Sequence, residues 1–365
     1  MRFLVLGNPE NRRIGLFRET CARLGLPAPG VLSWERYLAE GGTLAEQLDQ
    51  YDVLRIESSG ENFEVESSLI RKGGGEPVSE EEFLKGRIQN HEAWFRGWAK
   101  TMAEIDEEVS HRIPIMNSPM EIATIFDKYY CQRYLAESGL PVPRILGKAT
   151  NADAVFRLME SEGVSRVFVK PRHSSSASGV VALQRNNERV LATSSALLAE
   201  GRLYNSLKIS RYENHQDVTK ILDLLGREKL LVEQWFPKAV IDKRVTDFRV
   251  LVIDGKARHV VARTSRSPIT NLHLGNARGD LERIEKEIGD EIWSQAIEVC
   301  EEVARQFSGS FYLAVDLMIG ASRKSVAVAE VNAFGDLLPD LLSKGEETYE
   351  AEIKAWLVKD NQASA

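Results

Sequence analysis

Cysteine is scarce in this sequence. The 365 residues contain three cysteines, Cys21, Cys131 and Cys300, which lie far apart. An odd and scattered set argues against a disulfide framework and against a cysteine zinc cluster. Such cysteine usage is typical of a reducing compartment. We therefore expect a cytoplasmic protein that depends on its apolar core rather than on covalent links.

Long apolar runs and an excess of positive charge are also absent. No run reaches the ~18 residues that a membrane span needs, and residues 1–7 are too short for a signal peptide. Lys and Arg number 47 against 54 Asp and Glu, a formal net charge of −7. This balance argues against a general nucleic-acid-binding surface. We expect neither a membrane nor a nucleic acid as partner, and the sequence leaves the oligomeric state open.

Several common motifs are missing as well. The sequence contains no G-x-x-x-x-G-K-[ST] phosphate loop and no G-x-G-x-x-G dinucleotide fingerprint. It also lacks a G-x-S-x-G nucleophile elbow and a His-Glu-x-x-His zinc motif. The six histidines form no spacing pattern. These absences argue against the commonest nucleotide, hydrolase and zinc-protease sites.

The length and the order of apolar segments predict several lobes. At roughly 100–200 residues per domain, the chain has room for two or three. Residues 2–6 and 51–56 are typical of buried strands, and residues 14–24 show helical spacing between them. Strand, helix and strand indicate a small α/β unit with a mainly parallel sheet. We place the end of this first lobe near residue 115.

Two helix starts follow. Ser79 with Glu82 forms a capping box, and the apolar spacing behind it predicts one long amphipathic helix as far as Ile105. Ser118 with a proline directly after it is a second start, which predicts a helix as far as Gly139.

Three oxygen-bearing side chains lie in strand-like segments near the C-terminus. Asp316 stands inside an apolar strand, and Glu330 and Asn332, two residues apart, share a strand face. Hard oxygen ligands of this kind suit Mg²⁺. Alternatively, Asp316 caps a turn and Glu330 is a solvated edge charge. An acid among apolar residues is costly without a partner, which favours the metal.

Cations occur at comparable places. Lys170 ends a strand, Lys128 lies within the second predicted helix, Arg249 interrupts an apolar strand and Arg263 ends one. Each taken singly is more simply a surface charge whose stem lies on apolar atoms. Cations that end strands at one cleft are, however, what a polyphosphate requires.

A serine-rich loop joins two strand-like runs. Small residues let backbone N–H groups approach phosphate oxygens, and hydroxyls add donors. The alternative is a flexible loop without a ligand. The candidate phosphate-contacting residues are Ser174, Ser175, Ser176, Ser178 and Gly179.

An aromatic pair follows another strand. The segment Glu233-Gln234-Trp235-Phe236 joins a backbone edge to apolar surface, an arrangement that holds adenine in many sites. The alternative is an ordinary core strand.

In their order, these segments resemble the ATP-grasp superfamily, in particular its RimK-like and D-alanine–D-alanine ligase-like branches. The resemblance covers about residues 116–345. It rests on Asn117-Ser118-Pro119, Asp127-Lys128, Leu140-Pro141-Val142-Pro143, Val169-Lys170-Pro171, Glu233-Gln234-Trp235-Phe236, Asp247-Phe248-Arg249-Val250, Arg263, Asn271 to Asn276, Asp316 and Glu330-Val331-Asn332.

The resemblance implies an α/β and α+β protein with the ATP-grasp fold. An N-terminal α/β lobe with a helical insertion would span 1–115, a central lobe 116–232 and a C-terminal lobe 233–365. ATP would lie between the last two lobes.

The resemblance also implies roles for individual residues. Lys128 and Lys170 would contact the α- and β-phosphates, and the loop from Ser174 to Gly179 would close over them. Gln234 and Phe236 would present backbone groups to adenine. Two Mg²⁺ ions would bind to Asp316, Glu330 and Asn332. Arg263 would face the transferring phosphoryl group, Arg249 would line the acceptor or phosphate region, and residues 336–339 would stand where many relatives bind the acceptor.

The sequence departs from the family pattern at several places. The phosphate loop has one glycine where relatives have several, and no ribose-binding acid is evident besides Asp242. Residues 71–112 and 186–229 look like insertions, and residues 55–61 form a possible substrate loop.

The function implied is an ATP- and Mg²⁺-dependent carboxylate–amine ligase. An acyl phosphate would form on a small-molecule or peptide carboxylate, and an amine would displace the phosphate. One alternative is a small-molecule kinase on the same scaffold, which would need a base near its acceptor hydroxyl. Another is an ATP-binding partner protein without turnover.

Overall fold

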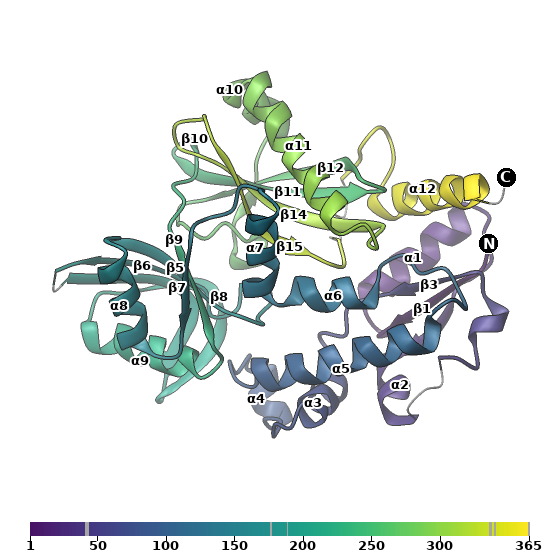
Figure 1. The fold of residues 1–365 in the computed structure, drawn as a ribbon, viewed down its shortest axis with the longest axis horizontal. Helices are drawn as coiled ribbons and strands as arrows, with labels where there is room; N and C mark the ends of the chain where they lie inside the picture. Colours follow the sequence, from purple (N-terminus) through teal and green to yellow (C-terminus); the bar gives the residue numbers. More distant parts are fainter. Residues whose placement is uncertain (41–43, 176, 188, 336–337, 339–340, 364–365) are drawn as a thin grey trace.

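The computed structural model of the chain describes residues 1–365 except 41–43, 176, 188, 336–337, 339–340 and 364–365. The described residues form three β-sheets with helices packed on them, and the expected mixture of α/β and α+β architecture is confirmed (Figure 1). No helix in this described part combines the length and the apolar character that crossing a membrane would need.

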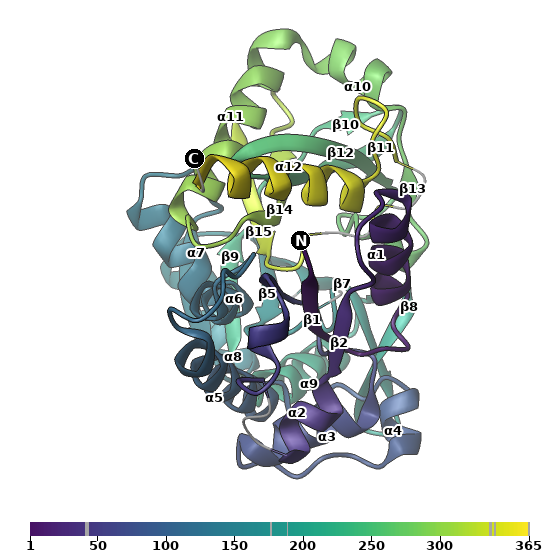
Figure 2. The same cartoon turned by 90° about the vertical axis from the view of Figure 1, so that its right-hand side faces the viewer.

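The first sheet is the predicted parallel unit. Strand β1 (Phe3–Gly7) lies between β2 (Gly30–Ser33) and β3 (Val53–Ile56), and both pairings are parallel. Helix α1 (Arg12–Arg23) packs beside the last helix of the chain, α12 (Thr348–Ala363), near the start of β1 (Figure 2). The C-terminal helix therefore completes the core of the N-terminal lobe. The lobe also contains α2 (Trp34–Glu40), the 3₁₀ turn η1 (Leu48–Gln50) and α3 (Phe63–Lys72).

The prediction of one long helix from Ser79 to Ile105 is wrong. Two helices stand there, α4 (Glu80–Leu84) and α5 (His91–Val109). The segment between them runs along β8 (Arg202–Tyr212) of the central sheet, where the Ile88 amide donates to the Leu203 carbonyl at 2.9 Å. The carboxylate of Glu228 accepts from the two backbone amides of Asn90 and Glu92 at the start of α5, at 2.8 and 3.1 Å. The two stretches interpreted as insertions thus contact each other.

The predicted helix from Ser118 to Gly139 is also interrupted. Ser118 caps α6 (Pro119–Phe126) as expected, but the backbone bends at Asp127 and α7 (Lys128–Glu137) begins there. The Asp127 side chain accepts from the Tyr130 amide at 3.1 Å, so it caps the second helix. Lys128 therefore begins a helix instead of lying within one.

The central sheet has the order β4-β9-β5-β6-β7-β8, with antiparallel pairs throughout. Helices α8 (Ala152–Ser161) and α9 (His215–Gly226) pack against each other on it. The loop between β5 and β6 joins two paired strands, as predicted. The expected lobe boundary at residue 232 falls inside β9. The strands are β4 (Ile145–Ala149), β5 (Arg166–Pro171), β6 (Val181–Asn186), β7 (Arg189–Ala199), β8 (Arg202–Tyr212) and β9 (Leu230–Gln234).

The C-terminal sheet has the order β13-β12-β11-β14-β15, and β10 pairs with β11. Asp254 and Gly255 form the predicted hairpin turn, with positive φ angles of 48° and 70°. Helix α11 packs on this sheet and α10 beside it (Figure 1). The elements are β10 (Val240–Ile241), β11 (Arg244–Ile253), β12 (Lys256–Ser265), η2 (Leu272–Leu274), β13 (Ala277–Arg278), α10 (Leu281–Ile288), α11 (Asp290–Gln306), β14 (Tyr312–Ile319) and β15 (Val326–Asn332).

A fully buried arginine joins the N-terminal lobe to the last helix. Arg55 on β3 pairs with Glu57 and with Glu352 of α12, each at 2.8 Å. Its guanidinium also lies over the rings of Phe17 and Tyr312, at 4.7 and 4.4 Å from the ring centres. A buried charge is tolerated because these groups replace the water that it has lost.

The buried pair makes folding stability depend on pH. Burial raises the pKa of Glu352 to about 7. In the unfolded chain the pKa of this side chain is lower, so between the two pKa values the folded protein binds a proton that the unfolded chain has released. Stability should therefore fall as the pH rises toward 7. From pH 5 to pH 8, we expect the free energy of unfolding of Glu352→Gln to increase relative to that of wild type by up to about 3 kcal/mol. Urea unfolding at both pH values measures this.

The control is Glu350→Gln on the same helix, whose carboxylate is hydrogen-bonded to Lys354 and has a lowered pKa. The free energy of unfolding of Glu350→Gln should show no such increase relative to wild type between the two pH values. A Glu352→Gln difference that is independent of pH would contradict the assignment.

Candidate nucleotide-binding site

A cavity of about 900 Å³ lies where the three lobes meet. This volume is within the range of small-molecule sites. Among the predicted site residues, those that line it are Lys128, Lys170, Ser174, Ser175, Glu233, Gln234, Phe236, Arg249, Arg263, Asp316, Glu330 and Asn332. Trp235, Ser178 and Gly179 are not among the described lining residues, and Ser176 lies outside the described residues.

The two lysines from the central lobe enter the cavity with acidic partners. Lys170 pairs with Glu233 at 2.7 Å and donates to the Ala329 carbonyl at 3.2 Å, and Lys128 pairs with Glu330. Burial acts to lower the pKa of Lys170, but the carboxylates of Glu233 and Glu330 outweigh it and raise this pKa. Lys170 is therefore held as a cation.

The backbone that carries these lysines is fixed by one carboxylate. Arg172, two residues after Lys170, makes two hydrogen bonds to Asp127 at 2.7 and 2.6 Å. His173 contacts the same carboxylate at 3.2 Å. Burial acts to raise the pKa of Asp127, but the bonds from His173 and Arg172 lower it to about 2. The end of β5 and the start of α7 are thus held together.

Charged side chains lie opposite one another on neighbouring strands of the C-terminal sheet. Asp247 lies opposite Arg263 in the pairing of β11 with β12, and Arg249 lies opposite Asp316 in the pairing of β11 with β14. Asp316 in turn lies opposite Glu330 on β15. Arg249 and Arg263 each donate to Asp316, at 3.2 Å. We call these five residues the charge ladder.

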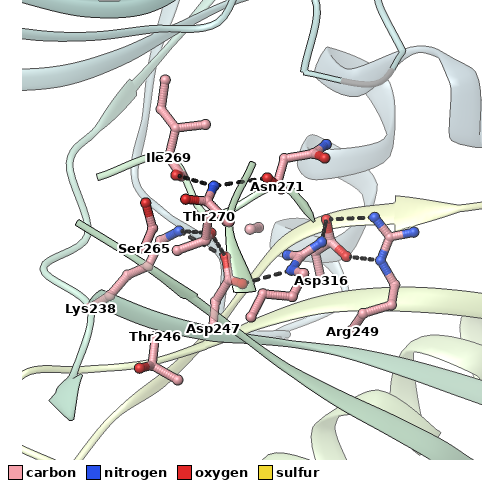
Figure 3. Close-up of polar contacts among 12 residues, drawn as sticks. Lys238, Thr246, Asp247, Arg249, Ser265, Ile269, Thr270, Asn271 and Asp316 are labelled. Atoms are coloured by element: carbon pink, nitrogen blue, oxygen red, sulfur yellow. Dashed lines mark hydrogen bonds and ion pairs between the residues drawn. The ribbon is translucent and has the colours of Figure 1, made fainter. Parts of the chain in front are cut away.

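Asp247 is hydrogen-bonded to three side chains of the site (Figure 3). It accepts from Arg263 and from Lys238, each at 2.8 Å, and from the Thr270 hydroxyl. Burial acts to raise the pKa of Asp247, but Arg263 and Lys238 lower it further than burial raises it. Burial is also the main cause that lowers the pKa of Lys238. Asp247 therefore fixes the position of Arg263.

Sequence reasoning missed Lys238 and Thr270 and gave Asp247 no role. All three line the cavity. A usable signal existed for Asp247, since it stands two residues before Arg249 and therefore shares a strand face with it. Lys238 and Thr270 come from irregular segments and carry no such signal.

Residues 123–335 match the protein family described as YheC/D-like ATP-grasp. The chain belongs to this family. The expected ATP-grasp fold is confirmed, whereas a RimK-like branch is not distinguished. None of the curated proteins matches the chain.

Several solved structures share the architecture of this family member. D-cycloserine synthetase DcsG has a TM-score of 0.57 at 15% identity, over 98% of this chain and 99% of that one. D-alanine–D-alanine ligase from Bacillus anthracis, complexed with ATP, has a TM-score of 0.57 at 14% identity, over the whole of both chains. The ATP-grasp ligase PsnB, complexed with a minimal precursor, has a TM-score of 0.53 at 16% identity, over 98% of both chains. At identities this low, the structural matches show a common fold and nothing more specific.

The predicted adenine segment of this ATP-grasp chain is partly engaged in the sheet. The amide of Gln234 donates to the Arg144 carbonyl at 2.9 Å, and the amide of Trp235 donates to the Arg166 carbonyl at 3.2 Å. Trp235 packs on Phe168 instead of facing the cavity, with the ring centres 5.0 Å apart. An adenine contact through a backbone N–H would therefore involve Phe236.

The serine-rich loop packs across the cavity. Ala177 contacts an apolar cluster that includes Ile269 and Leu274 of the C-terminal lobe. The Ser195 hydroxyl donates to the Ala177 carbonyl at 2.6 Å, and the Ser178 amide donates to the Ser175 carbonyl at 2.9 Å. The loop thus bridges two lobes in this arrangement.

Two minor expectations find no place in the cavity. Asp242 pairs with Arg283 on the surface at 2.5 Å and is not among the described lining residues. Of the expected acceptor segment, Leu338 lines the cavity, while residues 336, 337 and 339 lie outside the described residues.

The two central-lobe lysines can be tested without knowing the substrate. We expect Lys128→Met and Lys170→Met each to weaken ATP binding by roughly 10- to 150-fold, because each would remove one of the predicted charge-assisted phosphate contacts, worth ~1.5–3 kcal/mol. Calorimetry with ATP and Mg²⁺ measures the affinity. Lys148→Met, an exposed strand lysine outside the cavity, is the matched control. Unchanged affinity in both variants would refute the phosphate contacts.

Proposed function

We propose that the chain is an ATP- and Mg²⁺-dependent, ADP-forming carboxylate–amine ligase. The observation that carries the proposal is the charge ladder, which faces the same cavity as Lys128 and Lys170. Membership of the ATP-grasp family supports an ATP site between the central and C-terminal lobes. The lobe boundaries near 115 and 232 and a cytoplasmic location belong to the same proposal.

The reaction would proceed in two transfers. A carboxylate oxygen of the first substrate attacks the γ-phosphorus of ATP, the bond to the β-phosphate oxygen breaks, and ADP leaves. The nitrogen of an amine then attacks the acyl carbon, and the carbon–oxygen bond to phosphate breaks. Phosphoryl transfer needs positioning and neutralisation of charge more than covalent chemistry from the protein. Arg263, held by Asp247 and Asp316, and Lys170, held by Glu233, provide both.

The residues present fit a magnesium site in their chemistry. Asp316, Glu330 and Asn332 carry oxygen donors that Mg²⁺ prefers and line one cavity. The side-chain nitrogen of Asn332 has no partner among the described residues, so its amide is free to turn its oxygen inward. The carboxylates pair here with arginine and lysine, and no three of the described His, Cys, Asp or Glu side chains form a ready cluster. When bound, the metal would neutralise charge between the β- and γ-phosphates.

Ligase chemistry is favoured over the two alternatives. The similar structures include proteins named as a D-cycloserine synthetase, a D-alanine–D-alanine ligase and an ATP-grasp ligase complexed with a precursor peptide. Substrates of the present chain would accordingly be small-molecule or peptide carboxylates and amines. A partner protein without turnover would not need the complete set of cations and carboxylates that lines the cavity.

Trapping with hydroxylamine tests the reaction type. The enzyme is mixed with ATP, Mg²⁺, a pool of amino acids and dipeptides as carboxylates, and hydroxylamine. We expect a hydroxamate, detected by mass spectrometry, that forms only with ATP and in step with ADP and phosphate. Formation of AMP and pyrophosphate would exclude an acyl phosphate. A phosphorylated product that resists hydroxylamine would identify a kinase instead.

The metal ligands can be tested in the same assay. Glu330→Gln should keep its fold and lose at least about 100-fold in turnover, a barrier change of ~2.7 kcal/mol, because one carboxylate ligand becomes a neutral amide. The measurements are ADP release against Mg²⁺ concentration and thermal unfolding. Glu298→Gln, an exposed position on α11, is the control. Full turnover in Glu330→Gln would remove this residue from the metal site.

A further inference from the structure

The cavity extends from the phosphate side into the N-terminal lobe. There it is lined by the start of α1, the loop after β3 and the first turn of α3. The charged side chains at this end are Arg12, Arg13, Glu61 and Glu66. An acceptor that attacks an activated carboxyl group beside Lys128 would have to enter from this end, because the opposite end carries the adenine segment.

Six carboxylates of the described residues line the cavity. Four of them are paired with cations, and a fifth is exposed to solvent. Glu233, Asp247, Asp316 and Glu330 are each paired with a lysine or an arginine. Glu61 is exposed and accepts a long hydrogen bond of 3.4 Å from Asn11. The sixth is Glu66, and no described histidine lines the cavity.

Glu66 is held on a rigid turn. It lies in the first turn of α3, which Asn62 caps by accepting from the Val65 amide at 3.0 Å. The preceding loop is fixed by Asn8, whose amide donates to the carbonyls of Ser59 and Gly60, each at 3.0 Å. The Glu66 side chain is partly buried, and burial raises its pKa to about 7. No charged group among the described residues contributes to that shift.

A ligase with an amine substrate needs a proton acceptor at such a place. Amines of amino acids are protonated near neutral pH, and an ammonium nitrogen has no electron pair with which to attack. A carboxyl group whose pKa is close to the working pH is an efficient general base. A paired carboxylate of low pKa, such as Asp247, is a poor one.

We propose that Glu66 is the general base of the reaction and that the N-terminal end of the cavity takes a substrate with a primary ammonium group. The inference rests on the proposed ligase function. The ammonium gives one proton to the Glu66 carboxylate. The nitrogen pair then forms the bond to the acyl carbon, and phosphate leaves with the electrons of the broken carbon–oxygen bond. The leaving phosphate takes the second proton from the nitrogen, which gives the neutral amide. The proton on Glu66 passes to solvent before the next turnover.

An assay with two kinds of nucleophile distinguishes a general-base role of Glu66 from a role in substrate binding or in folding. Hydroxylamine is largely neutral near pH 7 and needs no base, whereas the amines of an amino-acid pool are protonated. Full-length wild type, Glu66→Gln, Glu66→Asp and the control Glu64→Gln are assayed with ATP, Mg²⁺ and that pool, with and without hydroxylamine. Glu64 is an exposed residue on the same helical turn that does not line the cavity.

We expect Glu66→Gln to lose about 100-fold in amide formation and to keep hydroxamate formation within about 2-fold of wild type, as an intact site without its base would. The wild-type amide rate should rise with pH and level off above about 7, the pKa of Glu66. The rate of Glu66→Gln should instead keep rising above pH 7, because without the base it follows the fraction of free amine. Glu66→Asp should restore part of the amide rate, and Glu64→Gln should behave as wild type.

Equal losses in both reactions, or an unchanged amide rate in Glu66→Gln, would overturn the role of Glu66 while leaving the ligase proposal intact. If wild type forms a hydroxamate but no amide from any amine, the ammonium substrate class is wrong. Failure of wild type to form either product would refute the ligase function itself, and the role of Glu66 with it.

Discussion

The pairing of four cavity carboxylates with lysine or arginine is the constraint on which the rest of the site depends; they are Glu233, Asp247, Asp316 and Glu330. Removing one partner would leave an uncompensated charge in a medium of low polarity, which costs several kcal/mol. Two contacts of the central-lobe lysines reach the C-terminal lobe. Lys128 pairs with the Glu330 carboxylate, and Lys170 donates to the Ala329 carbonyl. In the proposed complex, phosphates would become the partners of the lysines and Mg²⁺ the partner of the carboxylates. Binding would then exchange one set of neutralising groups for another without leaving a charge unpaired.

Sequence reasoning succeeded where a local pattern has one structural meaning. The two-residue spacing of Glu330 and Asn332 and the apolar surroundings of Asp316 predicted neighbouring strands, and β14 and β15 do pair with Asp316 opposite Glu330. It failed at the helix breaks, because apolar helical spacing continues across them. The break at Asp127 depends on Arg172, and the break before α5 depends on β8 and Glu228. Both causes are distant in the sequence.

The sequence also could not show which acidic residues have a charged partner in the folded protein. Glu66, Glu330 and Glu350 are the same residue type in three different surroundings. Glu66 faces the cavity without a charged partner among the described residues, Glu330 pairs with a buried lysine, and Glu350 lies near the surface. Ionic surroundings are set by tertiary contacts, so the sequence could indicate which acids interrupt apolar strands but not which acid is left unpaired. That is why Asp316 was found and Glu66 was not.

The buried Arg55 has a consequence for the order in which the protein is assembled on the ribosome. Its charge lies in the lobe that is synthesised before the other two, but one of its two carboxylate partners, Glu352, follows 297 residues later in the chain. Until that residue has left the exit tunnel, the nascent N-terminal lobe exposes the apolar surface that α12 covers and holds an incompletely neutralised arginine. The lobe that emerges first is therefore the last to be finished, and it is the one that a chaperone would have to shield during translation.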